Sequence, residues 1–100
     1  MLRFGLVILA KVQYTDTFET KKRPALVLFE EYGNVICAGI TSNLNMEGIP
    51  LPKSEGALQE SVIKLNYIFT IPEQAIEKVL FTITNEKKKI IKEELINKID

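Results

Sequence analysis

The sequence predicts a mainly β fold with appended helices (α+β), in which a small barrel is followed by a C-terminal amphipathic helix. Three observations carry this prediction. Apolar runs rich in β-branched residues alternate with short polar segments, a pattern typical of strands and turns. A Gly33-Asn34 pair lies between two such runs and favours a tight hairpin. Near the end of the chain, Ile91, Leu95 and Ile99 recur every four residues, which indicates a helix with one apolar face.

Length and charge limit the kinds of protein this chain can be. One hundred residues with 46% hydrophobic content fit a single domain, residues 1–100. The 13 basic residues balance the 13 acidic residues, so the net charge is zero. Because proteins bind polyanions largely through an excess of positive charge, we expect any anion site here to be a local cluster.

The N-terminal residues predict a strand. The apolar stretch Met1–Ala10 is too short to span a membrane, and Lys11 ends it. We therefore expect a first strand over Leu6–Tyr14, buried on both faces, and a cytoplasmic protein that makes no membrane contact. The polar residues Thr15–Lys22 that follow predict a loop.

A β-hairpin is predicted next. Pro24 has no backbone N–H to donate, so we place it at the first residue of a strand over Ala25–Glu30. The segment Glu31–Asn34 closes the hairpin, and its last two residues are expected to supply the positive φ angles of the turn. The partner strand is predicted over Val35–Ile40.

The second half of the chain is less regular, with many prolines, glycines and asparagines before residue 60. The predicted elements are, in order, an edge strand at Ile49–Pro52, a strand at Ser61–Phe69, a short helix that begins at the capping box Thr70–Glu73 and extends through Lys78, a short strand at Val79–Thr82, and a terminal helix at Asn85–Ile99 capped by Thr84.

The composition excludes several chemistries. The chain has no histidine, which rules out serine–histidine and cysteine–histidine catalysis and the usual zinc sites. Its single cysteine, Cys37, rules out an internal disulfide and lies in an apolar run, so we expect a buried thiol.

A fixed cation and two hydroxyls are predicted to meet at strand ends. In an antiparallel hairpin the start of one strand lies beside the end of the other, so Arg23 should lie near Thr41 and Ser42. A guanidinium group is always charged and binds oxyanions with two parallel hydrogen bonds. This combination favours a phosphate ligand, and hence nucleic acid as the first partner to consider.

Three segments in order resemble the MazF/PemK family of toxin endoribonucleases. They are Lys-Arg-Pro followed by Ala-Leu-Val-Leu, then Ile-Thr-Ser, then Ser-Val-Ile-Lys-Leu-Asn-Tyr-Ile-Phe-Thr-Ile. The resemblance implies a small SH3-like barrel that acts as a homodimer, cleaves single-stranded RNA and is inhibited by a cognate antitoxin. We expect this cleavage to need no metal ion or other cofactor.

The resemblance also implies site residues. The family's arginine and threonine correspond to Arg23 and Thr41. Many relatives carry an acidic residue where Asn66 stands here. Either Glu19 or Asp16 of the preceding loop removes the proton instead, or this chain is only weakly active. We further expect substrate contacts from Lys22, Ser42, Lys64, Asn66, Tyr67 and Phe18.

Other interpretations remain open at this point. The barrel is alternatively a non-catalytic binding module, such as a CcdB-like gyrase inhibitor or an inactive relative that binds antitoxin, or a nucleic-acid-binding barrel with no toxin role. Arg23 is alternatively paired with a carboxylate, and Thr41 is alternatively a turn former. Lys64 and Tyr67 have a structural alternative as outward-facing strand residues. The run Lys87-Lys88-Lys89 is expected to be ordinary charged surface.

Overall fold

A computed structural model of the chain describes residues 2–13 and 20–100. The elements are β1 (Leu6–Gln13), β2 (Thr20–Glu31), β3 (Asn34–Thr41), β4 (Ile49–Leu51), the 3-10 turn η1 (Lys53–Glu55), β5 (Ser61–Pro72), the 3-10 turn η2 (Glu73–Ala75), β6 (Ile76–Thr82) and the helix α1 (Asn85–Ile99).

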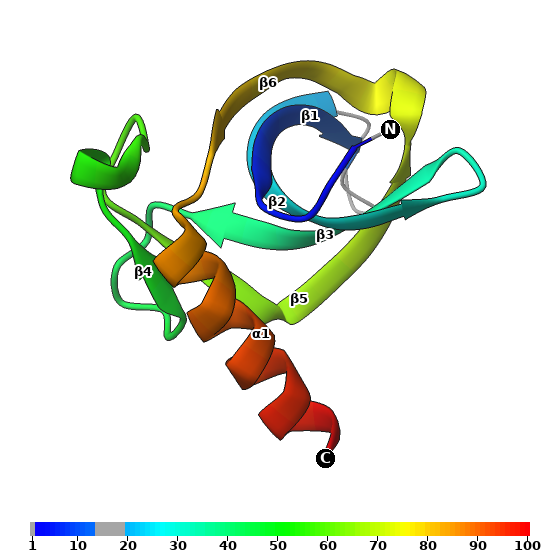
Figure 1. The fold of residues 1–100 in the computed structure, drawn as a ribbon. Helices are drawn as coiled ribbons and strands as arrows, with labels where there is room; N and C mark the ends of the chain where they lie inside the picture. Colours follow the sequence, from blue (N-terminus) through cyan, green and yellow to red (C-terminus); the bar gives the residue numbers. More distant parts are fainter. Residues whose placement is uncertain (1, 14–19) are drawn as a thin grey trace.

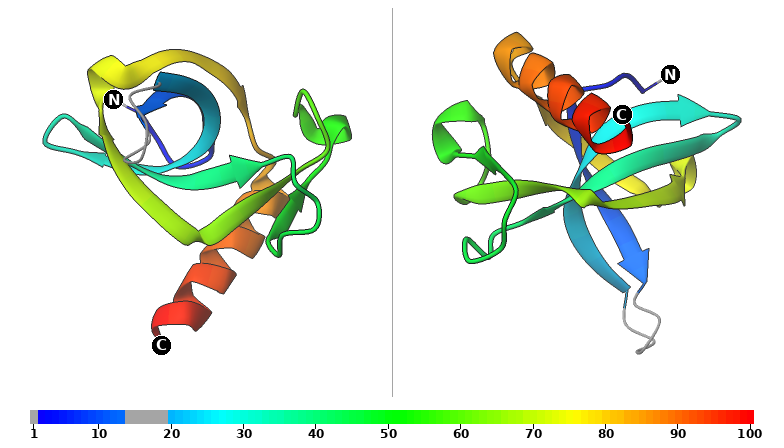
Figure 2. Two further views of the ribbon diagram at one scale, coloured as in Figure 1. Left: turned by 180° about the vertical axis from the view of Figure 1, so that it is seen from behind. Right: turned by 90° about the horizontal axis from the view of Figure 1, so that it is seen from below.

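The six strands form one antiparallel sheet in the order β4-β5-β3-β2-β1-β6. The sheet curls into a half-barrel, with β6 arching over β1 and β2, and α1 running beside β4 and β5 (Figure 1). The far ends of β1 and β2 extend away from the rest of the sheet (Figure 2). The predicted fold class, a small β barrel with a C-terminal helix, is confirmed.

Two apolar clusters lie on opposite faces of the sheet. Successive side chains of β1 belong to different clusters: Val7 is in one and Ile8 is in the other. Both side chains are buried, which confirms the prediction of a first strand covered on both faces. Cys37 belongs to the same cluster as Ile8 and is also fully buried, as predicted.

The β2–β3 hairpin has a two-residue turn. Tyr32 and Gly33 both have positive φ, at 53° and 80°, and Glu31 pairs with Asn34 across the turn. The hairpin is therefore confirmed, but the assignment of positive φ to Asn34 was wrong. Two central residues with positive φ form the turn whose twist matches a right-twisted hairpin.

Strand β2 begins earlier than the sequence predicted. It includes Lys22, which we had placed in a loop, and Pro24 lies inside the strand and pairs with Leu9 of β1. The pairing with β3 begins only at Ala25. Pro24 is thus tolerated because this part of β2 has a single strand partner.

A bulge bends β5 sharply. Ala38 of β3 pairs with Ile68, whereas the next residue, Gly39, pairs with Lys64, so residues 65–67 are left without partners on β3. The bend is visible as the V-shaped corner of β5 (Figure 1). Bulges of this kind redirect side chains and increase curvature.

The short helix predicted from Thr70 through Lys78 is absent. Strand β5 continues to Pro72, one 3-10 turn covers Glu73–Ala75, and β6 begins at Ile76. The proline does start a helical turn, but the strand pairing that follows limits it to three residues. Ile36 pairs with Thr70, so the first part of the expected capping box is extended β structure.

The terminal helix confirms its predicted bounds and cap. The Thr84 hydroxyl accepts a 3.0 Å hydrogen bond from the Lys87 backbone N–H. Ile91 is fully buried in the core, whereas Ile96 and Ile99 are 57% and 86% exposed. Within the described residues, no helix is long and apolar enough to cross a membrane.

Lys87 corrects the interpretation of the three-lysine run. Its side chain is buried rather than part of a solvated surface. The Nζ atom donates to the Pro50 carbonyl at 2.6 Å and lies 3.6 Å from a carboxylate oxygen of Glu55. Lys87 therefore joins α1 to the segment that contains β4 and η1.

Candidate nucleic-acid interface

Arg23 and Thr41 line the same two pockets. Together with Pro24 and Ile40 they are shared by both pockets, so these four residues form the ridge between them. The predicted meeting of Arg23 and Thr41 at neighbouring strand ends is thus confirmed. We call the two spaces the apolar pocket and the aromatic pocket.

The strand register explains why these residues meet. Ala25 and Gly39 form the last pair between β2 and β3 at this end. Two residues further along each strand are Arg23 and Thr41, where the strands have separated. Arg23 stays bound to β1 through its pairing with Ala10, and Thr41 stays bound to β5 through its pairing with Val62. The ridge is therefore held by two different strand pairs.

The Thr41 hydroxyl is oriented by its own turn. Its Oγ1 accepts a 3.1 Å hydrogen bond from the Asn43 backbone N–H, as the turn-former interpretation requires. A hydroxyl that accepts one hydrogen bond still has its proton to donate. Thr41 can therefore form this turn and also donate to a ligand oxygen.

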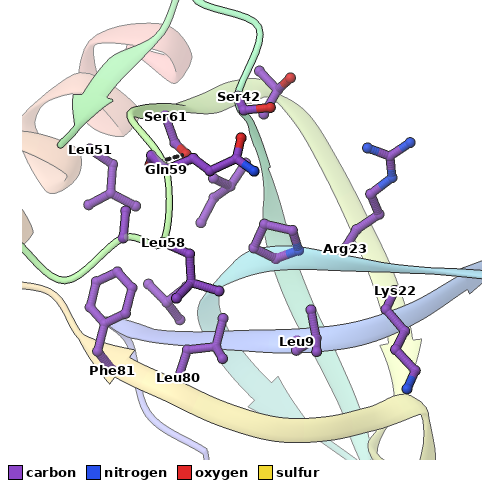
Figure 3. A pocket seen from close by; sticks show the side chains of 15 residues that line it. Leu9, Lys22, Arg23, Ser42, Leu51, Leu58, Gln59, Ser61, Leu80 and Phe81 are labelled. Atoms are coloured by element: carbon purple, nitrogen blue, oxygen red, sulfur yellow. Dashed lines mark hydrogen bonds between the residues drawn. The ribbon is translucent and has the colours of Figure 1, made fainter. Parts of the chain in front are cut away.

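The apolar pocket has a volume of about 230 Å³. Leu9, Leu58, Leu80 and Phe81 gather on one side of it, while the guanidinium of Arg23 and the side chain of Ser42 lie on the other (Figure 3). The segment before β5 supplies part of its wall, including Gln59 and Ser61. A space this small and apolar suits one side chain better than a whole ligand, because ligand pockets usually have volumes of about 300–1,000 Å³.

The aromatic pocket is larger, at about 410 Å³. Besides the ridge it is lined by Val12, Gly39, Met46, Lys64, Tyr67 and Phe69. The Lys64 ammonium lies 3.9 Å from the Met46 sulfur, a weak contact that leaves the charge at the pocket wall. The rings of Tyr67 and Phe69 have centroids 5.3 Å apart and planes inclined by 34°.

Gly39 makes room for Tyr67. A Cβ atom on Gly39 would lie 2.6 Å from Cδ2 of the Tyr67 ring, closer than real side chains allow. The bulge of β5 ends at Tyr67 and places its ring over this glycine. Tyr67 is thus held between Gly39 and Phe69, yet 53% of its surface is exposed.

Lys22 is engaged outside the aromatic pocket. Its Nζ donates a 3.0 Å hydrogen bond to Glu77 of β6, and Lys11 lies 3.7 Å from the same carboxylate. The hydrogen bond from Lys22 is the main cause that lowers the pKa of Glu77, and the charges of both lysines add to it. Lys22 also lines the apolar pocket, but its ammonium is directed away from the Arg23 guanidinium (Figure 3).

The other predicted substrate contacts lie in different pockets. Lys64 and Tyr67 line the aromatic pocket with Arg23 and Thr41, whereas Ser42 lines only the apolar pocket. Asn66 lines a third cavity, of about 550 Å³, between the bulge of β5 and α1. The candidates Asp16, Phe18 and Glu19 lie outside the described residues.

Sequence reasoning missed several residues of the aromatic pocket, among them Met46, Gly39 and Phe69. Met46 comes from an irregular segment with no local signal, and Gly39 has an ordinary strand environment in the sequence. Phe69 follows Tyr67 at the spacing of residues on one strand face, which was the one available indication. Among residues 2–13 and 20–100, no group of three His, Cys, Asp or Glu residues is arranged to hold a metal ion.

The architecture described above, a curled antiparallel half-barrel followed by a terminal helix, is also found among solved structures. The fold is similar to the structure of Mycobacterium tuberculosis toxin MazF-mt6, with a TM-score of 0.74 and 24% sequence identity over 92% of this chain and 93% of that chain. The family described as PemK-like, MazF-like toxin of type II toxin-antitoxin system matches residues 3–99. The chain belongs to this family. A comparison with curated proteins found no match.

Proposed function

We propose that this toxin is an endoribonuclease that cleaves single-stranded RNA and is inhibited by a cognate antitoxin. The family membership supports the class of activity, and one observation supports its location: Arg23 and Thr41 stand together on the ridge between two pockets. A ridge of this kind presents a cation and a hydroxyl to a phosphate from a strand of RNA that crosses it.

The proposed reaction uses the RNA's own 2′-hydroxyl as nucleophile. Its oxygen attacks the adjacent phosphorus and loses a proton, a cyclic phosphate forms, and the bond to the 5′ oxygen breaks as that oxygen gains a proton. Negative charge grows on the phosphate oxygens in the transition state, where preorganised donors have their largest effect. We assign Arg23 to this charge, with Thr41 as a neutral donor that orients one phosphate oxygen.

The reaction also needs one group to remove a proton and one to donate a proton. Arg23 rarely gives up a proton because of its very high intrinsic pKa, but in a chain without histidine it is our candidate for general acid or base as well. Asn66 cannot act as a base, and it lines the cavity beside α1 rather than the aromatic pocket. Glu19 therefore remains the proposed base, with Asp16 as its alternative, and Phe18 remains a proposed RNA contact.

Antitoxin inhibition fits the same ridge. A peptide that inserts an apolar side chain into the apolar pocket would pass over Arg23 and Ser42 at its mouth. It would then cover the groups that we assign to the phosphate. We also propose that the toxin is cytoplasmic, since RNA and antitoxin are both intracellular partners. We propose a homodimer as well, as the resemblance to the family implies.

The proposed function is tested by cleavage of a long single-stranded RNA, followed by a fluorogenic RNA–DNA chimera that contains one ribonucleotide linkage at the mapped cleavage site. Arg23→Ala should lower the rate about 10²–10³-fold, as expected for loss of a preorganised charged donor. Arg3→Ala is the matched control, because Arg3 is the chain's other arginine and is exposed. Excess chelator should leave the rate unchanged.

Two results would overturn this proposal. A folded Arg23→Ala protein that cleaves RNA at the wild-type rate removes the catalytic assignment and favours a non-catalytic binding module. Loss of activity in chelator with recovery in Mg²⁺ removes the metal-free mechanism. Circular dichroism of each variant checks that the fold is retained.

A further inference from the structure

We propose that the aromatic pocket binds an unpaired nucleobase stacked on the ring of Tyr67, next to the phosphate at Arg23 and Thr41. This inference rests on the proposed function and adds to it a physical role for Tyr67. It also names the part of the RNA that enters the pocket.

The ring of Tyr67 has the properties of a stacking platform. Gly39 and Phe69 hold it on two sides, so little rotamer freedom remains to be lost when a ligand binds. More than half of its surface is nevertheless exposed. A ring that its neighbours hold in place and that is still half exposed offers a planar surface on which another ring can stack.

The groups around Tyr67 suit a nucleotide rather than a purely apolar ligand. Arg23, Thr41 and Lys64, two cationic residues and one with a hydroxyl group, line the same pocket as Tyr67. A lining that combines cationic residues and a hydroxyl with two aromatic rings matches a phosphate linked to a planar base. Single-strand binders combine the same two features, a positive groove and aromatic side chains on which bases stack.

The volumes of the three pockets support the aromatic pocket as the site of the nucleobase. The aromatic pocket, at about 410 Å³, falls within the usual range of ligand sites, about 300–1,000 Å³. The apolar pocket is smaller and is crowded by leucines. The cavity beside α1 is larger but mixes Lys87 and Lys98 with Glu47 and Glu94, so it carries no clear preference for an anion.

Stacking predicts how binding depends on the side chain. Base–aromatic stacking contributes about 1–3 kcal/mol per base, so Tyr67→Leu should weaken RNA binding roughly 5- to 150-fold. Tyr67→Phe keeps the ring and should bind within about twofold of wild type. Every base has a π face, so this contribution should depend little on sequence.

The test uses a fluorescein-labelled ten-nucleotide RNA of random sequence with 2′-O-methyl groups throughout, which removes the nucleophile and prevents cleavage. Anisotropy measures its binding to wild type, Tyr67→Leu and Tyr67→Phe. Unlabelled RNA of the same kind is then titrated into Tyr67→Trp, a single-tryptophan reporter in a chain that has none. Tyr32→Trp is the matched control, because Tyr32 is 94% exposed in the β2–β3 turn.

Support requires weaker binding by Tyr67→Leu, retained binding by Tyr67→Phe, and fluorescence quenching at position 67 well above that at position 32. The inference is overturned if the RNA binds without quenching at position 67, if Tyr67→Leu binds like wild type, or if the RNA does not bind at all. Cleavage of natural RNA decides the proposed function separately. If RNA is cleaved but does not stack on Tyr67, only this inference is rejected. If RNA stacks on Tyr67 but is not cleaved, only the proposed nuclease activity is rejected.

Discussion

The Lys87 ammonium donates a 2.6 Å hydrogen bond to the carbonyl oxygen of Pro50, 37 positions earlier in the chain. This contact joins the first turns of α1 to the edge strand β4. The same ammonium lies 3.6 Å from Glu55, whose other carboxylate oxygen is buried and has no hydrogen-bond partner among the residues that the structure describes. The segment after Glu55 supplies Leu58 and Gln59 to the apolar pocket, so the contact also positions a wall of the candidate site.

We predict that Lys87→Met destabilises the fold by about 1.5–3 kcal/mol, the usual cost of losing a hydrogen bond to a charged group. The methionine fills most of the lysine's volume, so the loss reports the ammonium contacts rather than packing. Urea denaturation followed by circular dichroism measures the free energy of unfolding.

The neighbouring lysine provides the control for this prediction. Lys89→Met changes an exposed helix position and should alter the free energy of unfolding by less than about 0.5 kcal/mol. Equal losses from Lys87→Met and Lys89→Met would show that the contact with Pro50 contributes nothing measurable.

The sequence predicted the parts of the fold that depend on local chemistry. The turn glycine, the Thr84 cap and the alternation of apolar runs are each determined within a few residues, and each was confirmed. The meeting of Arg23 and Thr41 followed from the same hairpin. The helix expected through Lys78 failed because strand pairing, which involves distant residues, overrode a local capping signal.

The aromatic pocket could not be predicted in full because it depends on the bulge in β5. Regular alternation assumes that neighbouring side chains face opposite ways throughout a strand. Residues 65–67 interrupt that alternation, which places Asn66 beside α1 and Tyr67 over Gly39. No residue type in this segment predicts a bulge. The side chain that reaches the site is therefore known only from the pairing of β3 with β5.

Because the thiol of Cys37 is buried, we predict that the folded protein loses stability at alkaline pH. Burial raises the pKa of this thiol to about 11, from an ordinary value of 9.0. The unfolded chain therefore releases this proton at lower pH than the folded chain does. The stabilisation is complete below pH 9 and is lost as the pH rises from about 9 to 11, by roughly 2–3 kcal/mol in all.

Denaturation measured between pH 8 and pH 11 tests this prediction against Cys37→Ala, which has no titrating group at this position. The difference in unfolding free energy between the two proteins should shrink as the pH rises, because only the wild type loses the contribution of the neutral thiol. A difference that stays constant would contradict a thiol kept neutral by burial.

The surface predicts self-association. Ile96 and Ile99 are exposed on the last turns of α1, and β4 and β6 are the two edge strands of the sheet that the described residues form. Exposed apolar side chains and unpaired strand edges favour contact with a second copy. Sedimentation equilibrium at micromolar concentration should give the mass of a dimer. A monomer mass that does not change with concentration would exclude the proposed homodimer.

Thr41 offers the finest test of the proposed phosphate site. Thr41→Ser keeps both the acceptor for the Asn43 N–H and the proton available for a phosphate oxygen, so its cleavage rate should stay within about twofold of wild type. Thr41→Val has nearly the same shape but loses both functions. Loss of a hydrogen bond to a charged phosphate oxygen, about 1.5–3 kcal/mol, predicts a rate roughly 10- to 150-fold lower.

The kinetic pattern separates catalysis from turn formation. A bond made only in the transition state lowers kcat and kcat/KM by the same factor. We therefore expect Thr41→Val to lower both equally, and to lose less activity than Arg23→Ala because the hydroxyl carries no charge. If Thr41→Val is less stable but cleaves at the wild-type rate, the hydroxyl serves only the turn at Asn43, and Arg23 alone would remain assigned to the phosphate.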